Sequence, residues 1–263
     1  MIKILFIGDI IGEPGRKCVD YVLNNKINKE EYDLIIANGE NLAGGKGISK
    51  SVFEEVVNSG VSIVTLGNHS FSRKEAEEII NHPQVVRPLN YPEGVPGQGY
   101  CFVKTKNGVE VCVVNLLGRV FTIECLDCPF RTINKLLEKI KDRTKIIVVD
   151  FHAEVSSEKN ALGYFLDGKV SAVLGTHTHV PTADAKILPN GTAYITDVGM
   201  CGPQFSVIGL EIETVLKRFL YAIPQKFNVA KGLCQFNAVE VYIDEKTGNS
   251  LQVRQLLFEN IKI

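Results

Sequence analysis

Three short apolar runs divide the first third of the chain. Residues 2–8, 33–37 and 61–66 are rich in Ile, Leu, Val and Phe and show little alternation, which is typical of strands buried on both faces. Residues 12–25 carry a proline in their first turn, which favours a helix there. This order predicts a βαβαβα unit with parallel strands, and ligands bind at the carboxyl ends of such strands.

Two further helices are predicted from capping signals. Ser51 with Glu54, and Ser72 with Glu75, have the spacing at which a hydroxyl and a carboxylate satisfy the free amides of a helix start. We expect these two helices to follow the second and third apolar runs and so to complete the unit.

The pattern changes after residue 88. Residues 100–106 and 109–117 flank Asn107-Gly108, a strong hairpin signal, and residues 118–129 have no periodicity and predict a long surface loop. The rest of the pattern predicts helices over 132–142, 158–166 and 210–220, strands over 145–150 and 171–175, and hairpins over 185–196 and 235–257.

The organisation of the chain predicts one domain over residues 1–263. No linker, repeat or low-complexity segment interrupts it, and a chain of this length can bury a sizeable core. Both the parallel first part and the later hairpins fit the α/β class, with two mixed β-sheets packed face to face and flanked by helices.

Composition excludes several classes of protein. The net charge of −1 argues against a general nucleic-acid or membrane-surface binder. The first apolar run is too short for a secretion signal, and no window holds the ~18 apolar residues that a membrane span needs. The seven cysteines are scattered and do not resemble a disulfide framework. We therefore expect a cytoplasmic protein with reduced thiols.

His177 and His179 close the predicted strand over residues 171–175. On an extended backbone side chains repeat with period two, so both rings are expected to project to the same side. Sites with two metal ions about 3.5–4 Å apart need ligands spaced in this way, one ring for each ion. Two surface histidines are the alternative. The chain has five histidines, and two of them lie here, which favours the metal site.

Residues that can hold a metal follow five separate predicted strands. Singly, each has an ordinary explanation as a helix cap, a turn residue or a core histidine. Their joint position favours a metal site, and oxygen and imidazole ligands suit Mn, Fe, Co, Ni or Zn rather than a soft metal. The residues are Asp9, Glu40 with Asn41, Asn68 with His69, His152, and His177 with His179.

Five blocks of sequence resemble the ordered motifs of the calcineurin-like metallophosphoesterases. They are most similar to those of the YmdB-type bacterial branch, which is described as a phosphodiesterase of 2′,3′-cyclic nucleotides. The resemblance implies a four-layer, helix-flanked double β-sandwich over the whole chain. The blocks are Gly8-Asp9, Asn38-Gly-Glu-Asn41, Gly67-Asn68-His69, Phe151-His152 and Gly175-Thr-His-Thr-His179.

The same resemblance implies roles for these residues. A hydroxide held by a pair of metals would attack the phosphorus in line, and His69 would protonate the leaving oxygen. Glu40 would bridge the metals. The implied ligands are Asp9, Glu40, Asn41 and His179 for one ion, and Glu40, Asn68, His152 and His177 for the other.

The sequence departs from the wider superfamily at two positions. Ile11 stands where a histidine usually follows the first aspartate, and Glu40 stands where the bridging residue is usually aspartate. Both departures agree with the YmdB-type branch, in which Asn41 would complete the ligands. The expected cofactor is two divalent or mixed-valence transition-metal ions, with Fe or Mn favoured and Zn, Ni and Co left open.

A charge count favours a phosphodiester substrate. Two divalent ions, less the charges of Asp9, Glu40 and a bridging hydroxide, leave one positive charge, which suits a diester better than a doubly charged monoester. We therefore expect a hydrolase of small 2′,3′-cyclic nucleotides or other phosphodiesters. A phosphomonoesterase (a nucleotidase or phosphoprotein phosphatase) on the same site stays open, as does a regulatory or RNA-interacting protein with a structural metal site.

Cys125 and Cys128 have metal-ligand or redox spacing, but one such pair is a weak signal, and we interpret them as ordinary cysteines. The sequence does not fix the base preference, the native metal, any regulation, or whether the chain forms a homo-oligomer.

Overall fold

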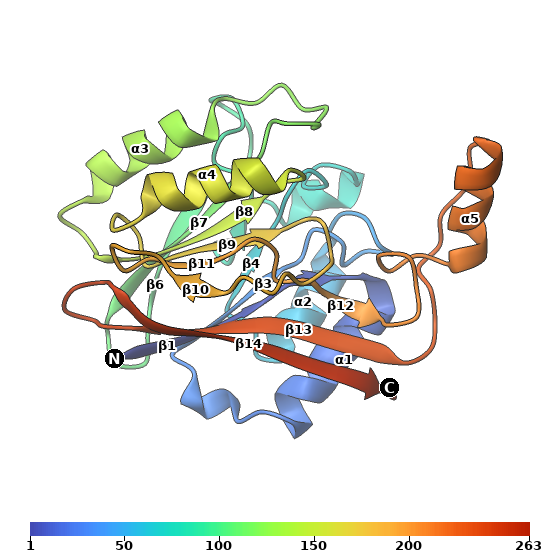
Figure 1. The fold of residues 1–263 in the computed structure, drawn as a ribbon, viewed down its shortest axis with the longest axis horizontal. Helices are drawn as coiled ribbons and strands as arrows, with labels where there is room; N and C mark the ends of the chain where they lie inside the picture. The colour runs from blue at the N-terminus through green and yellow to red at the C-terminus, as the bar shows by residue number, and fades with distance from the viewer.

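The computed structural model describes all residues 1–263. Two mixed β-sheets lie face to face, with helices on their outer faces (Figure 1). One sheet has the order β2-β12-β13-β1-β3-β4-β5, with β14 paired to β13, and the other has the order β10-β11-β9-β8-β7-β6.

The strands of the first sheet are β1 (Ile2–Ile7), β2 (Asp9–Ile10), β3 (Leu34–Asn38), β4 (Ile63–Thr65), β5 (Val85–Val86), β12 (Met200–Pro203), β13 (Cys234–Ile243) and β14 (Ser250–Ile261). Those of the second are β6 (Tyr100–Lys104), β7 (Glu110–Leu117), β8 (Ile146–His152), β9 (Ala172–Thr176), β10 (Lys186–Ile187) and β11 (Ala193–Ile195). The helices are α1 (Gly12–Asn25), α2 (Lys50–Asn58), α3 (Pro129–Ile140), α4 (Ser156–Leu166) and α5 (Ile212–Tyr221), with 3₁₀ turns η1 (Lys29–Glu31) and η2 (Lys74–Glu78).

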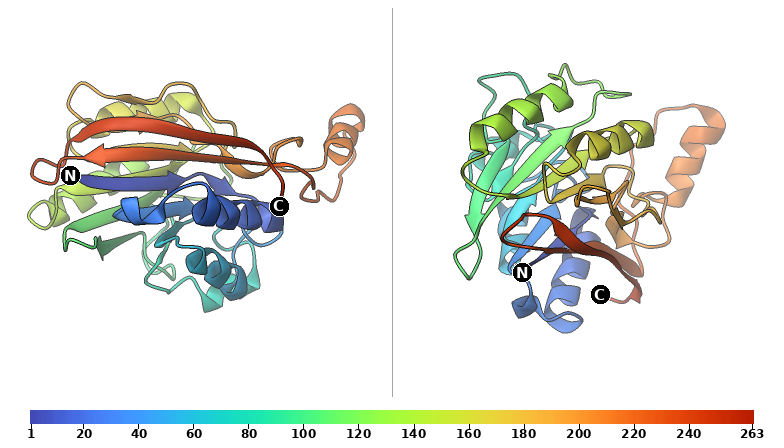
Figure 2. Two further views of the ribbon diagram at one scale, coloured as in Figure 1. Left: turned by 90° about the horizontal axis from the view of Figure 1, so that it is seen from below. Right: turned by 60° about the vertical axis from the view of Figure 1, so that its left-hand side comes forward.

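Three separate apolar clusters explain why the strands read as continuous apolar runs. In β1, Ile4 and Phe6 face a cluster between the two sheets, whereas Leu5 and Ile7 face a cluster shared with α1 and α2. A third cluster lies between the second sheet and the helices α3 and α4. The layers are thus helix, sheet, sheet and helix, so the predicted fold class is confirmed (Figure 2).

The parallel strands place their carboxyl ends at one edge of each sheet. In the first sheet, β1, β3, β4 and β5 run parallel, and in the second, β7, β8, β9 and β11 do so. The predicted hairpins are present as the antiparallel pairs β6–β7, β10–β11 and β13–β14. Strands β2, β5 and β12 were not predicted, because runs of two to four residues carry too little periodicity.

Both capping-box predictions are wrong. Helix α2 begins at Lys50, and the Ser51 hydroxyl contacts Ser49 Oγ at 3.2 Å instead of capping an amide. After Ser72 the structure has only the five-residue turn η2. Arg73 is held extended there because its guanidinium donates to the carbonyls of Lys46 (2.7 Å) and Ala43 (2.6 Å), which delays the turn.

No helix in the structure combines the length and the apolar character needed to cross a lipid bilayer. All seven cysteines are free thiols, including Cys125 and Cys128 in the loop before α3.

A buried carboxylate at the centre of the first sheet makes stability depend on pH. Glu240 on β13 accepts from Tyr32 Oη (2.6 Å) and Arg254 Nε (2.5 Å), and Lys3 Nζ lies 3.3 Å away. Burial acts to raise the pKa of Glu240, but these hydrogen bonds and charges outweigh it and hold the pKa below the ordinary 4.5.

Because the folded-state pKa is depressed, Glu240 contributes stability above pH 4.5 that is lost as the pH falls through the folded pKa. We expect the unfolding free energy of the unmodified chain to fall more steeply from about pH 5 to about pH 3 than that of Glu240→Gln. Urea denaturation across that range measures the difference, with the exposed Glu93→Gln as the matched control. Parallel curves for the unmodified chain and Glu240→Gln would contradict this account.

Candidate metal centre

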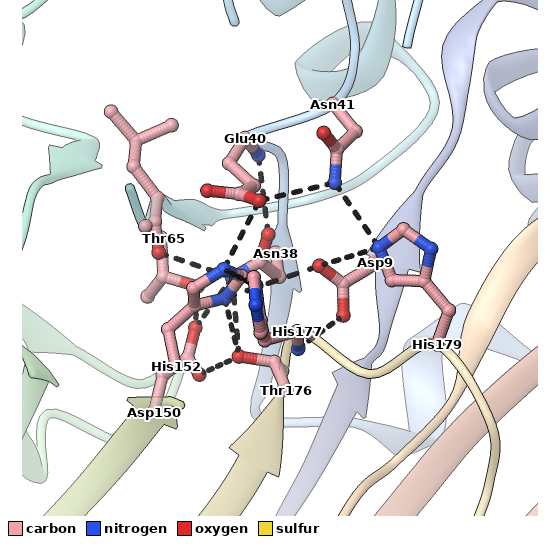
Figure 3. A network of polar contacts seen from close by, with 12 residues as sticks. Asp9, Asn38, Glu40, Asn41, Thr65, Asp150, His152, Thr176, His177 and His179 are labelled. Atoms are coloured by element: carbon pink, nitrogen blue, oxygen red, sulfur yellow. Dashed lines mark hydrogen bonds and ion pairs between the residues drawn. The ribbon is translucent and has the colours of Figure 1, made fainter. Parts of the chain in front are cut away.

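All eight residues predicted for the site lie together, where the carboxyl ends of strands from both sheets meet. Figure 3 labels six of them, Asp9, Glu40, Asn41, His152, His177 and His179. Each follows or ends a parallel strand, so the backbone directions of β1, β3, β4, β8 and β9 bring them to one place. They come from β2 (Asp9), the turn after β3 (Glu40 and Asn41), the turn after β4 (Asn68 and His69), the end of β8 (His152), and the turn after β9 (His177 and His179).

One group of donor atoms surrounds the Nε2 atom of His152. Glu40 Oε1 lies 3.0 Å from it, His177 Nδ1 2.9 Å and Asn68 Oδ1 3.1 Å. The donor atoms of Glu40, His152 and His177 all lie within 4.8 Å of one another. A carboxylate and two imidazoles that converge in this way are a donor set suited to a transition metal.

A second group contains Asp9, Asn41 and His179. His179 Nε2 lies 3.7 Å from Asp9 Oδ1 and 3.4 Å from the Asn41 amide nitrogen, which also donates to Glu40 Oε1 at 3.3 Å. Asp9 Oδ2 accepts from the His177 amide at 3.1 Å, but Asp9 Oδ1 is buried and has no hydrogen-bond partner. A buried carboxylate oxygen without a partner is costly, and a cation beside it would remove that cost.

The charges of the centre also favour a cation. Burial by itself lowers the pKa of His152, but the adjacent Glu40 outweighs burial and raises this pKa to about 9. Burial raises the pKa of Asp9. Burial and the neighbouring His152 lower the pKa of His177 to about 3, so this ring is neutral and can offer a lone pair. The donor group around His152 and the donor group of Asp9, Asn41 and His179 therefore both fit metal ions.

Gly67 leaves the room that this centre needs. A methyl group at this position would lie 2.3 Å from Glu40 Oε2 and 2.5 Å from His152 Nε2, which is closer than atoms can approach. Only glycine lets the backbone after β4 pass against both donors.

The backbone of the two neighbouring histidines differs from the prediction. Strand β9 ends at Thr176, and His177 and His179 have φ angles of 98° and 65°, in the left-handed region. The expected extended backbone is therefore wrong, although both rings line the same cavity. The rings turn to different groups, His177 towards His152 and His179 towards Asp9.

A buried ion pair holds this turn in its strained conformation. Asp197 Oδ2 accepts from both the amide (3.1 Å) and the hydroxyl (2.7 Å) of Thr178, which lies between the two histidines. Lys159 Nζ on α4 donates to the same oxygen at 2.7 Å, and both charged side chains are buried. Left-handed residues other than glycine cost about 1–3 kcal/mol each, and such contacts over-determine them.

Sequence reasoning also missed the polar residues beneath the centre. Asp150 is fully buried and accepts from Thr176 Oγ1 (2.7 Å), Thr65 Oγ1 (2.5 Å) and Asn38 Nδ2 (2.9 Å). Since the Thr176 hydroxyl donates to Asp150, its oxygen accepts from His152 Nδ1 at 2.9 Å. Nδ1 of His152 therefore carries a proton, and its Nε2 faces Glu40, Asn68 and His177. A carboxylate inside an otherwise apolar strand was the available signal.

His69 lies at the opening of the centre. Its amide donates to Glu40 Oε2 at 3.0 Å, and its Nδ1 contacts Asn41 Oδ1 at 2.9 Å. Burial lowers the pKa of His69, and the charge of Glu40 partly opposes this. Because the Asn41 oxygen faces His69 in this orientation, its role as a metal ligand stays a prediction. A cavity of about 280 Å³ opens here, lined by His69, Glu40, Asn41, Glu154, His177, His179 and the apolar Ile11, Ile208 and Leu210.

Removing one partner of the buried ion pair is expected to destabilise the fold. Lys159→Met leaves the Asp197 charge buried without its cation, so we expect a loss of about 3–5 kcal/mol in the free energy of unfolding. The double variant Lys159→Met/Asp197→Asn removes both charges and is expected to lose less. Urea denaturation measures this, with Lys135→Met on the exposed face of α3 as the control. A double variant no more stable than Lys159→Met would contradict the account.

Known proteins resemble this chain over nearly its whole length. A model of the YmdB-like protein family matches residues 5–256. A 2′,3′-cyclic-nucleotide 2′-phosphodiesterase of Bacillus subtilis (strain 168) is 45% identical over 259 residues, which cover 98% of this chain and 97% of that protein.

Two solved structures share the fold. A hypothetical protein from Thermus thermophilus superposes with a TM-score of 0.92 at 44% identity, covering 98% of this chain and 100% of its own. A novel phosphatase from Mycoplasma pneumoniae gives a TM-score of 0.92 at 37% identity, covering 99% and 94%. The predicted class of enzyme, a hydrolase, is confirmed by these relatives. The chain belongs to the family of YmdB-like proteins.

Proposed function

We propose that this chain is a metal-dependent phosphodiesterase that hydrolyses 2′,3′-cyclic nucleotides. The observation that carries the proposal is the pair of donor groups that meet at Glu40, with His69 beside them at the mouth of a small cavity. The activity named for the Bacillus subtilis relative, at 45% identity, supports the substrate class.

Glu40 is the residue that both metal ions would share. Its Oε1 atom faces His152, and the Asn41 amide links Glu40 to the group of Asp9 and His179. When bound, two such ions supply a nucleophile at neutral pH and neutralise the charge of the phosphoryl oxygens. The proposed ligands are Asp9, Glu40, Asn41 and His179 for one ion, and Glu40, Asn68, His152 and His177 for the other, with Fe or Mn favoured.

The cavity suits a small substrate. At about 280 Å³ it admits a compact molecule, and its lining includes the apolar side chains of Ile11, Ile208 and Leu210. The polar residues that line the cavity, among them His69 and Asn41, would orient the phosphate.

His69 is the proposed proton donor to the leaving oxygen. Its Nδ1 is engaged by Asn41, so Nε2 is the atom that can hold a proton towards the cavity. As the bond between phosphorus and the ribose O2′ breaks, this proton would pass to O2′ and leave a nucleoside 3′-phosphate. The single negative charge of a bound diester acts to raise the pKa of His69, against the effect of burial.

A phosphomonoesterase on the same centre is the second candidate. The structure of the Mycoplasma pneumoniae relative is described as a novel phosphatase, which favours this reading. Against it, Asp9 and Glu40 both lie in the centre and reduce the positive charge available to a doubly charged monoester.

Substitutions separate metal binding from turnover. We expect His69→Ala to keep its metal but to lose at least about 100-fold in kcat, because it removes the proton donor. His152→Ala removes a donor and should lower the metal content measured by elemental analysis. His82 packs against Phe53 outside the donor groups, so His82→Ala is the control and should change neither kcat nor the metal content. A fully active His69→Ala would remove this residue from the mechanism.

A substrate panel tests the function itself. We expect 2′,3′-cyclic nucleotides to be hydrolysed faster than bis(p-nitrophenyl) phosphate, and both faster than p-nitrophenyl phosphate. A chelator should abolish all three activities, and added Mn²⁺ or Fe²⁺ should restore them. Faster hydrolysis of the monoester would favour the phosphomonoesterase. Activity that survives chelation would show that the centre is not catalytic.

A further inference from the structure

Two of the three histidine rings in the donor groups are held by a hydrogen bond at the nitrogen that faces away from the other donors. His152 Nδ1 donates to the Thr176 hydroxyl at 2.9 Å. His179 Nδ1 donates to the Ile208 carbonyl, also at 2.9 Å. In each ring Nδ1 carries a proton, so Nε2 is the nitrogen that can bind a metal ion.

The ring of His177 is held by the carboxylate of Glu154. Its Nδ1 lies 2.9 Å from His152 Nε2, so Nε2 is the nitrogen left for a partner outside the donor group. Glu154 Oε2 lies 3.0 Å from that Nε2 atom. Burial and the neighbouring His152 lower the pKa of His177, so the ring is neutral and carries one proton. Because a carboxylate only accepts, this proton lies on Nε2, and the lone pair of Nδ1 faces the donor group.

The pairing of β8 with β9 places Glu154 beside this ring. The Ala153 amide donates to the Thr176 carbonyl at 3.4 Å, so the pairing continues one residue past the end of β8. Glu154 and His177 are the next residues on the two extensions. The Glu154 carboxylate has no second hydrogen-bond or ion-pair partner in the structure, so nothing competes with His177 for it.

The backbone of His177 does not orient its ring. Strand β9 ends at Thr176, and the φ angle of 98° at His177 lies in the left-handed region, so the pleat of the sheet no longer fixes the direction of the side chain. The contacts at the two ring nitrogens fix it instead. Of these, only the contact to Glu154 comes from outside the donor group.

We propose that Glu154 is a positioning residue of the metal centre, and that its carboxylate holds His177 with Nδ1 free to bind a metal ion. A carboxylate behind a histidine ligand fixes the ring and makes the other nitrogen a stronger donor, and its loss costs about 10–100-fold in metal affinity. This inference rests on the metal centre of the proposed function, but it does not depend on which phosphoester is the substrate.

Two other roles for Glu154 fit the geometry less well. Its Oε2 faces Nε2 of His177, whereas the donor group meets that ring at Nδ1, so Glu154 is not placed as a ligand itself. A main role in stability is also disfavoured, because the side chain is 49% exposed and its removal leaves no buried charge unpaired. The effect on metal binding can therefore be measured in a folded protein.

Calorimetric titration of the metal-free chain with Mn²⁺ tests the proposal. We expect Glu154→Ala to bind one ion about 10–100-fold more weakly and the other unchanged, because His177 belongs to only one donor group. Glu154→Gln keeps an oxygen that can accept from Nε2, so its loss of affinity should be smaller. Glu93→Ala, at an exposed turn residue, is the matched control and should bind both ions as the unmodified chain does. Two unchanged affinities in Glu154→Ala would overturn the inference.

Nitrogen-15 NMR of the metal-free chain separates this inference from the proposed function. In the unmodified chain and in Glu154→Gln, we expect a proton on His177 Nε2 that exchanges slowly with water, because it is hydrogen-bonded. In Glu154→Ala this signal should be lost to exchange. The His179 Nδ1 proton, which the Ile208 carbonyl accepts, is the internal control and should behave alike in all three.

The two measurements fail in different ways. A His177 proton on Nδ1 in the unmodified chain, or an Nε2 proton that exchanges equally slowly in Glu154→Ala, would overturn this inference alone. An unmodified chain that binds no Mn²⁺, Fe²⁺ or other transition metal would overturn it together with the proposed function.

Turnover at high metal concentration distinguishes a positioning role from contact with the substrate. At saturating Mn²⁺, Glu154→Ala should recover most of the kcat of the unmodified chain on a 2′,3′-cyclic nucleotide, with an unchanged KM, because only the occupancy of the metal site is affected. A KM that stays raised several-fold at saturating metal would show that Glu154 contacts the substrate and would overturn the positioning role.

Discussion

The buried carboxylate of Asp150 is the interaction on which the rest of the centre depends. It lies between the two sheets and accepts hydrogen bonds from Asn38 on β3, Thr65 on β4 and Thr176 on β9. Burial raises its pKa to about 6, and these donors stabilise the charged form. Strands of both sheets are thereby joined at their carboxyl ends, which is the condition for donors from separate turns to share one place. Thr176 also accepts a hydrogen bond from His152 Nδ1, which fixes the orientation of the His152 ring.

The buried ion pair of Asp197 and Lys159 also positions residues of the centre. Buried ion pairs contribute little net stability, because removing two charges from water costs about as much as their attraction returns. What the pair of Asp197 and Lys159 provides is position, since it fixes Thr178 and with it the left-handed turn of His177 and His179. Fold and site are therefore linked through polar contacts, while the apolar clusters determine the layers.

The sequence predicted the longer strands and the convergence of the eight candidate residues, because apolar runs and strand-end polar residues are local signals. It failed where the decisive contacts are distant. The Ser51 and Ser72 hydroxyls have the spacing of caps, but helix α2 already begins at Lys50, and only a five-residue turn follows Ser72. Asp150 meets Asn38 across 112 positions of sequence, and no pattern within one strand reveals such a partner. The two histidines lie in the two donor groups, but their backbone depends on Asp197, which follows a different strand.

Anomalous diffraction from crystals of the metal-loaded chain, recorded at the absorption edge of the metal found by elemental analysis, is the most direct test of a shared centre. The account predicts two peaks about 3.5–4 Å apart with the Glu40 carboxylate between them, one beside Asp9 and His179 and the other beside His152 and His177. A single peak, or peaks that lie away from Glu40, would contradict it.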